Sequence, residues 1–239
     1  MMKRTIAAWI AAIAVSVCGE TFETDDEVSI TLPDGWVQIP GNVLQEFSET
    51  MDVLSPDTPR QVYDYGYQKD GDGNWLSYPY ILVQFRPTGR IPSGELARYQ
   101  QMSTQMLGDI GLSEVRLGTS SYDREHQILW SMLSTHARNG ETVKALVAVK
   151  LTEVGYIRLT GCATAESFDE YETVFRDTFS SLGIAESIAY KPQFADTMPV
   201  IGGIMTGKVV VWFVQAVMIG GVLWLAYIAL KRLARKPGT

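Results

Sequence analysis

An uncharged, apolar run over residues 209–230 constrains this chain more than any other feature of its sequence. Gln215 is the only strongly polar residue in the run, and at about 1.5 Å per residue a helix of this length crosses the hydrocarbon core of a bilayer. The tail that follows, residues 231–239, is basic, and an excess of Lys and Arg places such a flank in the cytoplasm. The sequence therefore predicts one C-terminal transmembrane helix with a cytoplasmic tail.

The N-terminus carries a second membrane signal. Lys3 and Arg4 precede an apolar segment that is short of a membrane span but has the length of a secretory signal core. We predict a signal peptide over residues 1–18, with an uncleaved N-terminal anchor as the alternative. The residues before Cys18 bring to mind a lipoprotein box, so lipidation of Cys18 is a further alternative. Both basic ends favour the cytoplasm, which predicts a single-pass protein of the cytoplasmic membrane with its body on the periplasmic, extracytoplasmic side.

The body between these two signals is acidic. All 27 Asp and Glu residues lie within residues 19–207, and the two ends of the chain contain none. A negative body repels phosphate backbones, so we expect no nucleic-acid partner. With 46% hydrophobic residues, the chain is able to form one sizeable core.

Periodicity and turn residues predict a single α+β domain over residues 19–188. The expected strands are residues 28–32, 36–39, 61–68, 75–85, 113–117, 122–137, 142–151 and 155–162. The expected helices are residues 42–53, a second helix after Ser93, and a third that begins at Ser167, whose hydroxyl forms a capping box with Glu170. Residues 189–208 contain Pro192 and Pro199 and are predicted to be a linker to the membrane.

The order of these elements resembles the PsbP-like fold, the fold of the photosystem II subunit PsbP and of the Ran-binding protein Mog. The sequence LPDGW at residues 32–36, expected as a hairpin turn, and the final amphipathic helix are part of this resemblance, which covers residues 28–184. The resemblance implies an antiparallel β-sheet flanked by helices, an α/β/α sandwich. It also implies a protein that acts by binding a partner, and it transfers no catalytic residues.

Five tyrosines share one face of the expected 61–85 hairpin. If Gln68 pairs with Trp75, strand alternation brings together Tyr63, Tyr65, Tyr67, Tyr78 and Tyr80. Such a face either packs beneath a helix or forms a partner-binding surface, because tyrosine offers apolar area with a hydrogen-bonding tip.

Other residues raise the possibility of catalysis or metal binding. Asp70, Asp72 and Asn74 match the first three ligand positions of a calcium loop, but Trp75 and Ile81 stand where glycine and glutamate are needed. Glu125 and His126 are adjacent, and on the expected strand they point to opposite faces. Cys162 has no base tied to it by a motif, so we expect a buried, inert thiol.

The sequence thus favours a membrane-anchored extracytoplasmic accessory or binding module that acts through a protein partner. We expect it to be no enzyme and to need no cofactor or metal. The alternative is an envelope enzyme or metal-dependent factor that uses Asp70 and Asp72 or Glu125 and His126. Ala216 and Gly220 form a small-xxx-small pair in the predicted anchor, which would allow a weak homodimer.

Overall fold

The computed structural model describes residues 19–24, 27–54, 61–71, 73–96, 115–136, 141–193 and 196. The predicted signal peptide, the predicted transmembrane helix at residues 209–230 and the basic tail all lie outside these residues, as do Ala216 and Gly220. No helix within the described residues is long and apolar enough to cross a membrane.

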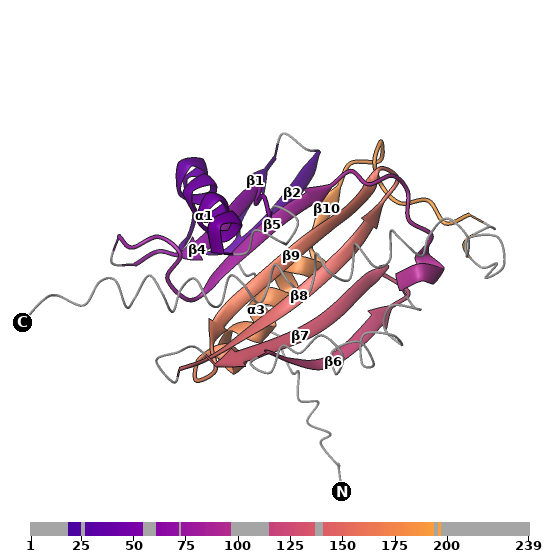
Figure 1. Cartoon of the computed structure of the whole chain (residues 1–239). Coiled ribbons are helices and arrows are strands. Elements are labelled where there is room, and N and C mark those ends of the chain that lie inside the picture. The colour runs from indigo at the N-terminus through magenta and orange to yellow at the C-terminus, as the bar shows by residue number, and fades with distance from the viewer. Residues whose placement is uncertain are drawn as a thin grey trace, which may run out of the picture.

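Antiparallel strands form two sheets in the described part of the chain (Figure 1). The large sheet has seven described strands in the order β3-β4-β5-β9-β8-β7-β6, and the small sheet has the order β1-β2-β10. The large sheet comprises β3 (Trp36–Gln38), β4 (Tyr65–Lys69), β5 (Tyr80–Arg86), β6 (Val115–Asp123), β7 (Ile128–His136), β8 (Thr142–Thr152) and β9 (Gly155–Thr164). The small sheet comprises β1 (Gly19–Glu23), β2 (Val28–Pro33) and β10 (Gly183–Ile184).

The two faces of the large sheet carry separate apolar cores. Helix α1 (Gly41–Leu54) contributes Leu44 and Phe47 to the core on one face, the α1 face. Helix α3 (Phe168–Ser180) contributes Phe175 and Phe179 to the core on the opposite face, the α3 face, which β2 also covers. The predicted α+β fold with helices on both sides of an antiparallel sheet is confirmed. The small sheet is an addition that the sequence did not predict.

The LPDGW segment is a corner between the sheets and not the predicted hairpin turn. Strand β2 before it pairs with β1 and β10, whereas β3 after it pairs with β4. Gly35 lies in this corner with a φ of 79°, a conformation that glycine adopts without steric cost. The hairpin prediction failed because β1, which shows no clear alternation, and β10 occupy the two edges of β2, so β3 has no edge of β2 to pair with.

The predicted strand over residues 122–137 is interrupted. Strand β6 ends at Asp123, residues 124–127 form a turn, and β7 begins at Ile128. Asp123 Oδ1 accepts the backbone N–H groups of Glu125 and His126 at 2.9 and 3.1 Å, which stabilises the turn. An aspartate that bonds the backbone two residues further on is a common turn former.

Helix α3 begins at Phe168, directly after the predicted first residue Ser167, and without the predicted capping box. Ser167 is the N-cap residue, and its side chain makes no capping hydrogen bond. The Ser167 hydroxyl instead lies 2.9 Å from the Thr164 hydroxyl at the end of β9. The second helix is described only over residues 93–96, and the rest of its expected length lies outside the described residues.

Candidate functional site

The β4–β5 hairpin has a longer loop than the sequence predicted. Gln68 pairs with Tyr80, and Tyr65 pairs with Val83, so the predicted pairing of Gln68 with Trp75 is wrong. Pro79 lacks the N–H that an inner ladder position must donate, so β5 begins only after it. The loop between the strands, residues 70–79, is called the tip below; residue 72 lies outside the described residues.

The five tyrosines do not share one face. Tyr63 and Tyr80 belong to the core on the α1 face, with exposed fractions of 6% and 0%, and Tyr78 packs partly buried against it. Tyr67 is 1% exposed in the core on the α3 face, where Tyr65 packs partly buried at its edge. Tyr63, Tyr67 and Tyr80 are therefore packing residues. A partner-binding role stays a prediction for Tyr65 and Tyr78 only.

A bend at Asp64 explains why Tyr63 departs from the alternation. The Asp64 backbone N–H donates to the carbonyl oxygen of Val83 at 3.0 Å, and its carboxylate accepts the N–H of Phe85 at 2.7 Å. The Asp64 side chain thus takes a position that a backbone carbonyl would hold in a regular ladder. The chain turns there, and Tyr63 packs against Phe47 of α1 at a ring distance of 5.4 Å.

The side chain of Gln68 holds the part of the tip around Trp75 through two hydrogen bonds to the backbone. Gln68 is 4% exposed; its Nε2 donates to the carbonyl oxygen of Asn74 at 3.0 Å, and its Oε1 accepts the N–H of Leu76 at 2.7 Å. Leu76 is buried in the core on the α1 face, which fixes the loop from below. Trp75, between these two contacts, is 37% exposed. The tip therefore presents a tryptophan from a loop that is tied down on both sides.

The residues considered for metal binding or catalysis have local structural roles. Asp70 is exposed, and its carboxylate accepts the N–H of Gly71 at 2.9 Å; Asp72 lies outside the described residues. Glu125 and His126 lie in the β6–β7 turn, not on a strand, and His126 Nδ1 is 2.8 Å from Asp123 Oδ2. Among the described residues, no three His, Cys, Asp or Glu side chains are placed to hold one metal ion. Burial raises the pKa of the Cys162 thiol well above its ordinary value.

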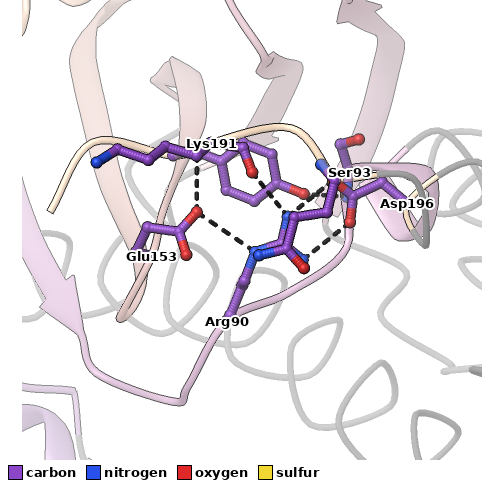
Figure 2. A network of polar contacts seen from close by, with 7 residues as sticks. Arg90, Ser93, Glu153, Lys191 and Asp196 are labelled. Atoms are coloured by element: carbon purple, nitrogen blue, oxygen red, sulfur yellow. Dashed lines mark hydrogen bonds and ion pairs between the residues drawn. The ribbon is translucent and has the colours of Figure 1, made fainter.

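A second constellation, which the sequence did not suggest, lies at the other end of β5 and is centred on Arg90 (Figure 2). Arg90 Nη1 and Nη2 donate to the two carboxylate oxygens of Asp196 at 2.9 and 2.8 Å. Arg90 Nε donates to Glu153 in the β8–β9 turn at 3.3 Å, and its guanidinium lies 4.6 Å from the ring centre of Tyr190. Glu153 in turn accepts the backbone N–H of Lys191 at 2.7 Å. These five residues, Arg90, Glu153, Tyr190, Lys191 and Asp196, are called the Arg90 clamp below.

The charges of the clamp stabilise one another. Burial by itself raises the pKa of Asp196, but hydrogen bonds from Arg90, the Gln193 N–H and Tyr190 outweigh it, so the pKa lies below its ordinary value. Burial and the hydrogen bond to Asp196 raise the pKa of Tyr190 to about 12, so its hydroxyl stays protonated at neutral pH. The Asp196 carboxylate is therefore charged while the clamp is formed.

The clamp holds the beginning of the predicted linker. Ala189 forms an isolated bridge with Thr152, and the Gln193 N–H donates to Asp196 Oδ2 at 2.7 Å. No local motif could have predicted this arrangement, because Arg90 is 63 residues from Glu153 and 106 from Asp196. A pair of opposite charges so far apart in sequence carries no signal until the fold brings the two charges together.

No protein-family model and no curated protein matches this chain. Among solved structures it is similar to cyanobacterial PsbP (CyanoP) from Synechocystis sp. PCC 6803, with 9% identity, a TM-score of 0.38, and coverage of 74% of this chain and 98% of that one. It is also similar to LpqN, described as involved in cell envelope biogenesis of Mycobacterium tuberculosis, with 11% identity, a TM-score of 0.40, and coverage of 72% and 91%. The PsbP-like resemblance expected from the sequence is thus found again as structural similarity. At such identities and TM-scores the similarity says nothing about activity or partners.

Proposed function

We propose that this protein is a membrane-anchored, extracytoplasmic accessory module that binds a protein partner through the tip of its β4–β5 hairpin and performs no chemistry of its own. The single observation that carries this proposal is the exposed Trp75 on a loop that Gln68 and Leu76 hold in place. Tryptophan is among the residues most enriched in the energetic centres of protein interfaces. A loop that is already ordered loses little conformational entropy when it binds.

The position of the tip supports the same proposal. Strand β5 runs from Tyr80, next to the tip, to Arg86, four residues before Arg90, and its six residue-to-residue steps of about 3.3 Å separate its two ends by roughly 20 Å. Figure 1 shows the loop after β4 at the left of the molecule and the last described part of the chain, in orange, at the right. The chain continues towards the predicted anchor from the clamp end. The tip and the last described residues thus lie beyond opposite ends of β5, which supports a tip that faces away from the proposed membrane attachment.

The basic ends and the apolar run at residues 209–230 support the proposed location in the cytoplasmic membrane, with the body outside.

Tyr78 belongs to the tip and is included in the proposed contact surface. The Tyr78 ring stacks on the buried Tyr80 ring at a centroid distance of 5.3 Å, so a partner that contacts Tyr78 would press on a residue packed against the core.

Site-specific photo-crosslinking tests this proposal on the full chain in native membranes. A photo-reactive amino acid replaces Trp75 in one sample and Val62 in the control; Val62 is 42% exposed and lies outside the tip. We expect one discrete protein adduct from position 75 and none from position 62. Trp75→Ala should weaken capture of that same protein by more than about tenfold, while the free energy of unfolding changes by less than about 1 kcal/mol. Equal adducts from both positions, or no adduct from position 75, would contradict the proposal.

A further inference from the structure

The Arg90 clamp joins three separate stretches of the chain at one end of the sheet. Arg90 comes from the segment after β5, Glu153 from the β8–β9 turn, and Tyr190, Lys191 and Asp196 from the segment that leads to the predicted anchor. Three residues after Arg90, the Ser93 backbone N–H donates to Tyr190 Oη at 2.8 Å. A surface ion pair between two mobile side chains would not involve so many fixed partners.

Close packing around Asp196, as well as its ion pair with Arg90, fixes the position of this residue. Asp196 is 8% exposed, and its backbone carbonyl oxygen would lie 2.6 Å from a Cβ atom built on Gly94. Any larger residue at position 94 would therefore displace the Asp196 backbone. Arg90 binds Asp196 through two parallel hydrogen bonds, the geometry in which an arginine–carboxylate pair is most directional. The segment is thus seated in a shaped site and not loosely attached.

We infer that the Arg90 clamp shortens the membrane tether and keeps the clamp end of the domain facing the bilayer, with the tip facing away. This inference rests on the membrane anchoring proposed above. When the clamp is formed, the tether begins after Asp196 and consists of residues 197–208. When it opens, residues 191–196 join the tether and add up to roughly 20 Å of reach at about 3.4 Å per residue. The clamp therefore sets both the height and the orientation of the tip above the membrane.

The distance of each end of the domain from the bilayer can be measured by fluorescence energy transfer. The full chain is reconstituted into lipid vesicles that contain an acceptor-labelled lipid. A donor dye is attached to Val154→Cys at the clamp end or to Ser77→Cys in the tip, in a Cys18→Ser background. Cys162 is fully buried and does not compete for the dye. We expect strong transfer from position 154 and weak transfer from position 77. Equal transfer from both positions, or stronger transfer from position 77, would overturn the inference.

Two variants of the clamp test whether it is the clamp that holds position 154 close to the bilayer. Asp196→Asn removes the charge with almost no change in volume, and Gly94→Ala pushes the Asp196 backbone out of its seat without touching any charge. Both should lower transfer from position 154 at least about twofold, because the domain moves away from the acceptor lipids when the clamp no longer shortens the tether. Arg176→Ala is the matched control: Arg176 also pairs with a carboxylate, Glu172 at 2.7 Å, and lies over an aromatic ring, Trp130 at 5.2 Å, but it is on α3.

Circular dichroism and thermal melting of each variant serve to check that the domain stays folded. Unchanged transfer in folded Asp196→Asn and Gly94→Ala would overturn the role of the clamp and leave the anchoring intact. Failure of the unmodified chain to remain in alkali-washed membranes would overturn the anchoring and the inference together.

Discussion

The two ends of the large sheet are organised by different forces. At the tip, one uncharged side chain, Gln68, orders the loop through hydrogen bonds to backbone groups, and an apolar residue, Leu76, pins it to the core. At the other end, the Arg90 clamp relies on paired charges drawn from distant segments. The contacts that hold Trp75 in place involve no titrating side chain, whereas the contacts of the clamp depend on the charges of Arg90, Glu153 and Asp196.

The largest effect is expected when the clamp loses its cation. Arg90→Ala leaves the nearly buried Asp196 carboxylate without its bidentate partner, and we expect the free energy of unfolding to fall by about 2–3 kcal/mol. The Arg90 side chain is 19% exposed, which keeps the cost below that of a fully buried pair. Urea unfolding of the full chain in detergent measures the change, with Arg176→Ala as the control at less than about 1 kcal/mol. A cost for Arg90→Ala no greater than that of the control would remove the distinction between a seated clamp and a surface ion pair.

A smaller loss is expected at the tip. Gln68→Ala removes the hydrogen bond to the N–H of the buried Leu76 and the one to the carbonyl oxygen of Asn74, which should lower the free energy of unfolding by about 1–2 kcal/mol. The rate of amide hydrogen exchange should rise in residues 73–77 and stay unchanged around Arg90, since the Gln68 side chain makes its two hydrogen bonds to Asn74 and Leu76 in the tip. If protection is lost at both ends, the ends are one cooperative unit and the comparison drawn above is wrong.

The smallest effect separates the two ends by pH. The folded-state pKa of Asp196 lies below its ordinary value of 3.8, so its charge stabilises the fold above that value, and this contribution is lost as the pH falls through the lower folded-state pKa. The cost of Arg90→Ala should therefore shrink between pH 5 and the acid limit of folding, in urea titrations at each pH. The cost of Gln68→Ala should stay constant over the same range, because Gln68 does not titrate. A parallel pH dependence for both variants would contradict the assignment of charge to one end only.

The apolar pattern of continuous segments predicted the last helix and the strands of the meander correctly. The apolar stripe of the last helix predicted its packing on the sheet, and Phe175 and Phe179 lie buried there. The apolar segments that form β8 and β9 were predicted at nearly their observed bounds, and both strands are buried on both faces of the sheet. These predictions succeed because the burial of a continuous element is recorded in that element's own residues.

The tyrosines show where such patterns stop. Strand alternation predicted five rings on one face of the hairpin. The bend at Asp64 places Tyr63 on the opposite face from Tyr65. The start of β5 after Pro79 pairs Gln68 with Tyr80, which changes the register of the hairpin. In the same way, the LPDGW segment reads as a hairpin turn until β1 is seen to pair with β2. A side chain that replaces a ladder bond, or a strand that arrives from elsewhere in the chain, leaves no period in the local sequence.

By itself, the sequence determined the α+β class, the antiparallel meander and the final helix, and it predicts the membrane-facing ends, because each depends on the composition and periodicity of one continuous segment. Only the tertiary structure decided which tyrosines are buried, that Trp75 is presented on a fixed tip, and that Arg90 meets Glu153 and Asp196. The physical reason is that exposure and ion pairing are properties of residues brought together by folding, and distant partners are specified by the packing of the whole sheet rather than by their neighbours in the chain.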